Sequence, residues 1–363
     1  MYARASVRAR TQKVELQADM KHIGFLTFGH YQHGRGSAVP TARDALLQTI
    51  ELAVAAEKLG LDGAYLRVHH FARQQSSPFP VLAAIAARTQ RIEIGTAVID
   101  MRYENPLSMA EEAAQSDLIA GGRLQLGISR GSPQTALNGQ ELFGYVPAAG
   151  ETDADMARRH TELFRQAIAG ANIARSDPHM TAGRSLPLTI QPQSPGLSER
   201  IWWGSGTRAS ARWAGEQGMN LMSSTLLTED TGVPFDELQT EQIAIFRQAW
   251  KDAGWEHEPR VSVSRSVLPI VNDLDEALFG RERDSTDQIG RMPEPGSPQA
   301  RFGKTYAGEP DIIAEQLARD AAVREADTLL ITVPNTLGVD YNVHLLTAIV
   351  EHIAPAIGWQ RAT

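Results

Sequence analysis

From residue 22 onward, short runs rich in β-branched and aromatic residues alternate with longer segments whose apolar residues recur every three or four positions. The short runs are typical of buried strands, and the longer segments are typical of amphipathic helices. Several helical segments end at a glycine, the usual stop signal, at Gly60, Gly121, Gly170 and Gly254. The pattern predicts eight strands, at 22–28, 62–68, 91–99, 123–129, 200–204, 219–224, 260–271 and 327–333.

Eight strands, each followed by a helix, predict a (β/α)8 TIM barrel that forms a single domain over residues 20–363. An open doubly wound sheet is the alternative, but eight regular units without a linker favour the closed barrel. Residues 171–199 interrupt the repeat before the fifth strand, where we expect a small hairpin. The long polar stretch 272–307 follows the seventh strand. It is predicted to be a lid at the C-terminal face, with a disordered loop as the alternative.

Composition and charge narrow the class of protein. The net charge of −8 argues against a nucleic-acid binder, and no run of about 18 apolar residues predicts a membrane span. Without cysteine there are no disulfides, thiolate nucleophiles or cysteine-bound metals, and a cytoplasmic location is expected. Residues 1–19 are basic but lack the apolar stretch of a secretory signal, so we expect a disordered N-terminal extension.

A glycine turn, "GSGTRAS" at 204–210, connects the fifth strand to its helix. Gly204 and Gly206 permit a close approach to the backbone, and the free N–H groups of the helix N-terminus favour a phosphate. Thr207 and Ser210 add two hydroxyl donors. The turn therefore predicts a phosphate site, with an ordinary helix cap as the alternative.

Two adjacent histidines, His69 and His70, follow the second strand, and Arg130 follows the fourth. Adjacent histidines rarely bind one metal ion, and no supporting set of carboxylates is evident, so no metal site is predicted. An imidazole can instead move a proton near neutral pH. A guanidinium at a strand end suits an anion, although a surface salt bridge is its commoner role. A phosphate-bearing cofactor is the resulting hypothesis.

The sequence resembles the luciferase-like monooxygenases, a flavin-dependent family, in three stretches: "AAEKLGLDGAYLRVHHF", "LAAIAARTQRIEIGTAVIDMRYENPLSMAEEAAQSDLIAGGRLQLGISRG" and "YAGEPDIIAEQLARDAAVREADTLLITVPN". The resemblance implies a barrel that binds reduced FMN at its C-terminal mouth and uses O2 to oxygenate a small organic substrate. It also implies a separate NAD(P)H-dependent flavin reductase and a homodimer. Two alternatives share the fold: hydride transfer that depends on F420, and a non-catalytic flavin-binding subunit.

The resemblance also assigns roles to single residues. His69 and His70 match the catalytic histidines of a Glu-His-His motif, but the expected glutamate is Val68 here. That departure puts a luciferase-type aldehyde reaction in question and leaves flavin binding untouched.

For the cofactor, Arg130 matches an arginine of the phosphate region and Arg158 a second one. Thr207 and Ser210 match positions at which hydroxyl side chains of family members contact the flavin phosphate. The segment "GTAVI" matches a strand end that carries a cis peptide bond beneath the flavin ring, which would be Ala97–Val98.

Overall fold

The computed structural model describes residues 21–34, 36–131, 135–229, 232–291 and 299–361. The extension expected at 1–19 lies outside these ranges. Within them, no helix is both long enough and apolar enough to cross a membrane.

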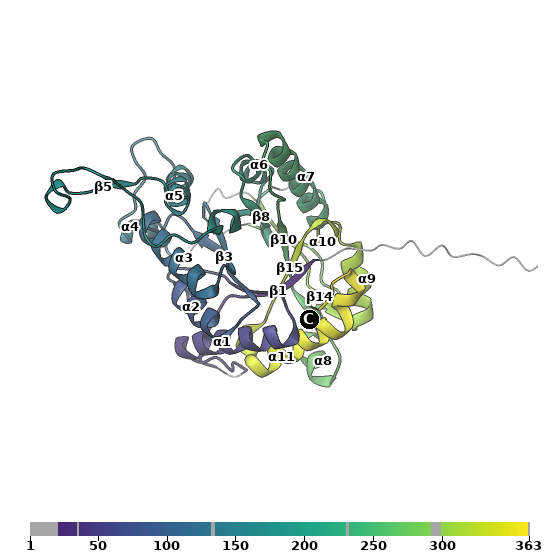
Figure 1. Ribbon diagram of the computed structural model, residues 1–363. Helices are drawn as coiled ribbons and strands as arrows, with labels where there is room; N and C mark the ends of the chain where they lie inside the picture. The colour runs from purple at the N-terminus through teal and green to yellow at the C-terminus, as the bar shows by residue number, and fades with distance from the viewer. Residues whose placement is uncertain (1–20, 35, 132–134, 230–231, 292–298, 362–363) are drawn as a thin grey trace, which may run out of the picture.

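Eight parallel strands form a closed barrel at the centre of the molecule, with helices around it (Figure 1). Each strand pairs with the next barrel strand of the chain, and the last strand pairs with the first. The predicted (β/α)8 fold is therefore confirmed, and each predicted run overlaps one barrel strand. These strands are β1 (His22–Thr27), β2 (Gly63–Leu66), β3 (Glu93–Asp100), β4 (Leu124–Ser129), β7 (Ile201–Ser205), β8 (Asn220–Ser223), β10 (Val261–Arg265) and β15 (Thr328–Thr332).

The barrel strands are buried on both faces, which is why they appear in the sequence as nearly continuous apolar runs. In β1, Ile23 and Phe25 point outward into the main hydrophobic core under the helices, whereas Leu26 belongs to a separate buried cluster. That second cluster is supplied by residues of the barrel strands themselves and fills the barrel interior. Its members are Leu26, Tyr65, Ala97, Val98, Trp202, Met222 and Leu330.

Capping residues mark the ends of the surrounding helices. Thr41 and Asp44 form a capping box at the start of α1, and Gly60 ends that helix with a φ of 91°. Gly121 and Gly254 end helices in the same left-handed conformation, as predicted. Gly170 lies one residue beyond a C-cap at Ala169. The main helices are α1 (Ala42–Leu59), α2 (Phe79–Arg88), α3 (Pro106–Ala120), α5 (Asp153–Ile168), α6 (Arg208–Glu216), α7 (Phe235–Ala253), α9 (Pro310–Arg319), α10 (Ala321–Glu325) and α11 (Val339–Ala348).

One long helical pattern, near residues 310–323, is divided in two by Asp320. Asp320 is extended, with φ −65° and ψ 114°, and caps α10 by accepting a hydrogen bond from the backbone N–H of Val323. The guanidinium of Arg265 and the hydroxyl of Tyr306 donate to the same carboxylate, at 2.7 and 2.5 Å. The break therefore depends on partners from distant parts of the chain.

The first insertion contains the expected hairpin. Strands β5 (Ala174–Arg175) and β6 (Pro187–Leu188) pair antiparallel, and the segment extends away from the barrel (Figure 1). It lies before β7, the fifth strand of the barrel.

The described residues of the second insertion include regular secondary structure. It contains α8 (Asp273–Phe279), β12 (Gln288–Arg291), β13 (Gln299–Phe302) and β14 (Tyr306–Gly308). The run predicted as one seventh strand ends in the barrel at β10, and its continuation β11 (Val267–Pro269) pairs with β14 instead. Strand β13 pairs with β9 (Leu226–Leu227), which follows β8. The insertion therefore lies at the C-terminal ends of the barrel strands, as predicted.

Candidate active site

A cavity of about 650 Å³ lies at the C-terminal end of the barrel. Leu26, Ala97, Val98 and Met222 from the interior cluster form its floor. Phe302 of β13 also lines the cavity, so the second insertion borders its opening. At the opposite end of the barrel, the side chains of Arg260 and Glu93 occupy the interior and form an ion pair of 2.7 Å.

Most residues selected from the sequence meet in this cavity. The lining includes eight of them: His69, Ala97, Val98, Arg130, Gly204, Gly206, Thr207 and Ser210. Two others, His70 and Arg158, do not line it. The residues that converge come from the ends of β2, β3, β4 and β7, which the barrel brings to one rim.

The Ala97–Val98 peptide bond is cis, at the position that the family resemblance indicates. Both side chains are nearly buried in the cavity floor, and the pairing of β3 with β4 shifts between Thr96 and Ile99. Gly204 of the neighbouring β7 packs closely against this bond, because a Cβ atom would lie only 3.1 Å from both Cγ atoms of Val98. The floor is therefore closely packed and apolar.

The glycine turn caps the following helix, one of the two roles that the sequence left open, and its hydroxyls also line the cavity. Thr207 is the N-cap of α6, and its Oγ1 accepts a hydrogen bond of 3.1 Å from the backbone N–H of Ser210. Ser210 Oγ accepts one of 3.0 Å from Trp203 Nε1. Each hydroxyl is used as an acceptor, so each keeps its own hydrogen to donate. Both hydroxyls line the cavity, where an anion could accept from them.

Arg130 lines the cavity as well, and Arg158 lies close enough to repel it. Burial lowers the pKa of Arg130, and repulsion from Arg158 lowers it further. Arg158 reaches the region from α5, where its guanidinium lies 5.6 Å from the ring centre of Trp213 and 3.9 Å from Asp155. Of the two guanidinium groups, only that of Arg130 lines the cavity together with the two hydroxyls, and an anion bound there would offset its repulsion from Arg158.

Arg67 is the residue that the sequence analysis missed. It lines the cavity and donates from Nε to His69 Nε2 and from Nη1 to the carbonyl of Ala97, both at 3.2 Å. Because a guanidinium can only donate, His69 Nε2 accepts and the imidazole proton resides on Nδ1. Burial lowers the pKa of Arg67 to about 10, so the group stays charged at neutral pH. Its spacing from His69, two residues along an extended segment, could have revealed it.

His70 points away from the cavity, as expected for consecutive residues of an extended segment. Its ring stacks on Tyr103 at 4.4 Å and meets the edge of Phe143 at 5.1 Å, and burial lowers the pKa of His70. Val68, at the position of the family glutamate, is buried in the main hydrophobic core. Only one of the two adjacent histidines therefore faces the cavity.

No cluster of three or more His, Asp or Glu side chains suited to a metal ion occurs in the part of the chain that the structure describes.

Comparison with known proteins gives a family match over most of the chain. The model of the luciferase-like monooxygenase family matches residues 20–329. An uncharacterized protein of Sinorhizobium fredii, y4wF, is 31% identical over 202 residues, which cover 54% of this chain and 55% of y4wF. The match thus spans little more than half the length of that relative. Limonene 1,2-monooxygenase of Rhodococcus erythropolis is 23% identical over 276 residues, or 69% of this chain and 67% of that enzyme.

Solved structures share the fold at low sequence identity. The oxygenating constituent of 3,6-diketocamphane monooxygenase from Pseudomonas putida, in complex with FMN, superimposes with a TM-score of 0.65 and 17% identity, covering 93% of this chain and 99% of that one. The F420-dependent tetrahydromethanopterin reductase of Methanopyrus kandleri gives a TM-score of 0.63 and 13% identity, with the same coverage.

Proposed function

The chain belongs to the luciferase-like monooxygenase family, and from this membership we propose that it is a flavin-dependent monooxygenase that oxygenates a small organic molecule with reduced FMN and O2. One observation carries the proposal. A single cavity joins a cationic, hydroxyl-rich end at Arg130 and Thr207 to an apolar floor at Ala97–Val98. A phosphate on a planar ring system is the chemistry that such a cavity complements.

The residues present fit FMN. The cavity volume, about 650 Å³, falls within the range of small-molecule sites, which is about 300–1,000 Å³. The hydroxyls of Thr207 and Ser210 and the guanidinium of Arg130 would hold the phosphate. The apolar floor, with Leu26 and Met222, would receive the ring. Reduced flavin, when bound, supplies the electrons that activate O2.

Among the chain's own groups, His69 is the candidate for moving a proton. Arg67 donates to its Nε2, so the ring proton resides on Nδ1, the nitrogen from which His69 would pass a proton to a substrate or to the flavin. The same guanidinium donates to the Ala97 carbonyl, and therefore fixes the imidazole relative to the floor. Phe302 and Leu226 line the opening, where they would exclude water from the reacting atoms.

The proposed substrate is a small, largely apolar molecule, because most residues that line the cavity are uncharged. Phe28, Leu226 and Phe302 lie around the opening, with serine and threonine hydroxyls between them. A separate NAD(P)H-dependent reductase would supply the reduced flavin. The description of the Pseudomonas putida relative as the oxygenating constituent of a monooxygenase supports this proposal. The homodimer and the lid motion of 272–307 stay predictions.

The test is oxygen consumption coupled to product formation. Purified protein, supplied with FMN, NADH and a general flavin reductase, is assayed against a panel of apolar ketones, terpenes and aromatic compounds. We expect at least one compound to raise product formation above the reductase background. If hydride transfer with F420 reduces or oxidises a substrate while FMN supports no turnover, the rival function is correct. Tight FMN binding without any turnover would instead indicate a non-catalytic subunit.

A further inference from the structure

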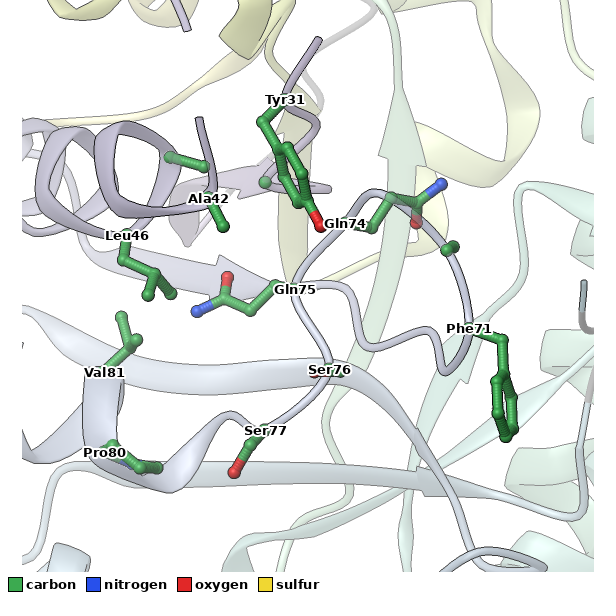
Figure 2. A pocket seen from close by; sticks show the side chains of 13 residues that line it. Tyr31, Ala42, Leu46, Phe71, Gln74, Gln75, Ser76, Ser77, Pro80 and Val81 are labelled. Carbon is green, nitrogen blue, oxygen red and sulfur yellow. The ribbon is translucent and has the colours of Figure 1, made fainter. Parts of the chain in front are cut away.

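A second cavity, of about 320 Å³, lies beside the candidate active site and shares none of its lining residues. It is a partly open cavity, lined by the first turns of α1 and α2 and by the loops that follow β1 and β2 (Figure 2). Ala42, Leu46, Pro80 and Val81 supply an apolar wall. Among the described residues that line it, none is an acid, a lysine, an arginine or a histidine, so none of them would compensate a charged ligand.

One polar side chain lies inside this cavity without a partner. Gln75 is 4% exposed, and both its Nε2 and its Oε1 are buried without a hydrogen bond among the described residues. Figure 2 shows the amide pointing between the two helices, toward Leu46 and Val81. An unpaired buried amide costs free energy, and a ligand that both accepts and donates a hydrogen bond would remove that cost.

The main chain of Gln75 connects this cavity to the candidate active site. Its carbonyl accepts a hydrogen bond of 2.9 Å from the backbone N–H of His69, and its own N–H donates to the carbonyl of Phe28 at 3.3 Å. Phe28 and His69 both line the larger cavity. A ligand bound to the Gln75 side chain would therefore lie directly behind the wall that positions His69.

We propose that the second cavity is a binding site for a neutral, mostly apolar small molecule whose carboxamide, or a similar donor–acceptor group, pairs with the Gln75 amide. The volume suits a compact ligand, at the lower end of the usual range of about 300–1,000 Å³. Ser76 and Ser77 at the edge offer further hydrogen bonds to the polar end. The inference does not depend on the proposed function, because neither flavin nor O2 takes part in binding.

The experiment titrates the flavin-free full chain with cyclohexanecarboxamide and, as a charged counterpart, with cyclohexanecarboxylate, followed by ligand-observed NMR. We expect saturable binding of the carboxamide and affinity for the carboxylate lower by about tenfold or more. Gln75→Leu should weaken carboxamide binding about tenfold, since it removes both hydrogen bonds. Val81→Phe should weaken it by filling the cavity from the opposite wall. Gln248→Leu, an exposed site on α7, is the matched control and should change nothing.

Thermal unfolding separates lost binding from lost structure. Gln75→Leu should be at least as stable as the natural protein, because the change removes an unpaired buried amide and keeps the side-chain volume. Three results would overturn the proposal: no saturable binding of the carboxamide up to its solubility limit, equal affinity for the carboxylate, or full affinity in Gln75→Leu. FMN binding is measured separately on the same variants. A failure of the carboxamide site would leave the flavin proposal intact, and a failure of FMN binding would leave the carboxamide site intact.

Discussion

At the scale of single residues, the sequence predicted which residues follow the strands but not which side chains each of them contacts. The positions of His69, Arg130 and Thr207 at the C-terminal ends of strands follow from counting alternating elements. The orientation of His70 toward Tyr103 depends on a stacking partner more than thirty residues away in the chain, so sequence spacing could only predict that the two histidines diverge. The role of Arg67 depends on Ala97, which also comes from another strand.

The two histidines should therefore respond differently to alanine substitution. His69→Ala should lower kcat by about 10²- to 10⁴-fold, the usual contribution of a positioned acid–base group, and leave thermal stability nearly unchanged. His70→Ala should retain turnover but lower the free energy of unfolding by about 1–2 kcal/mol, because it removes ring packing against Tyr103 and Phe143. Steady-state kinetics and urea unfolding on both variants provide the comparison. If both variants lost turnover to the same extent, the proposal that only His69 acts as the acid–base group would be wrong.

Glu104, which follows β3, gives a prediction for pH dependence. Burial, together with repulsion from Glu112 and Asp100, raises the pKa of Glu104 to about 7. Between pH about 4.5 and about 7, the folded protein therefore keeps this carboxyl protonated, whereas the unfolded chain has released the proton. The free energy of unfolding consequently falls as the pH rises from about 4.5 to about 7. Glu104→Gln removes the cost. The variant should be more stable than the natural protein by about 1–3 kcal/mol at pH 8 and equal to it at pH 4.5.

Urea unfolding of both proteins at pH 4.5, 6 and 8 measures this difference. A gain in stability that is the same at every pH would mean that titration of Glu104 is not its cause.

At the scale of elements, local signals determined most boundaries. Capping residues such as Thr41 and terminal glycines such as Gly60 act within a few residues of the chain, so they can be read directly from the sequence. The break between α9 and α10 could not be read in this way. It exists because Asp320 turns its carboxylate to Arg265 and Tyr306, which lie on other elements.

Removing that carboxylate should be costly. Asp320→Ala leaves the guanidinium of Arg265, which is almost fully buried, without its counter-ion. We expect the free energy of unfolding to fall by about 3–5 kcal/mol. Thr41→Ala, which removes the exposed cap of α1, should cost about 1 kcal/mol and serves as the comparison. The paired change Arg265→Met with Asp320→Leu should restore much of the loss, and a double variant as unstable as Asp320→Ala would contradict the explanation.

At the scale of the whole molecule, the order of strands and helices was enough to predict the barrel and the face that carries its cavity. Eight repeats allow few other arrangements, and strand ends in a barrel must meet at one rim. The internal structure of the second insertion escaped prediction, because β13 pairs with β9 across more than seventy residues. The second cavity escaped as well, since its walls come from four segments that show no common motif.

The central claim is that the rim of the barrel holds a phosphorylated flavin with its phosphate at Arg130 and the 204–210 turn. Calorimetric titration with FMN and with riboflavin, which lacks the phosphate, tests it most directly. We predict that FMN binds at least about tenfold more tightly than riboflavin, as expected for charge-assisted hydrogen bonds to a phosphate. Arg130→Met should abolish that preference, and Arg159→Met, an exposed arginine on the same helix as Arg158, should preserve it. Equal affinities for the two flavins in the natural protein, or no uptake of either, would contradict the account.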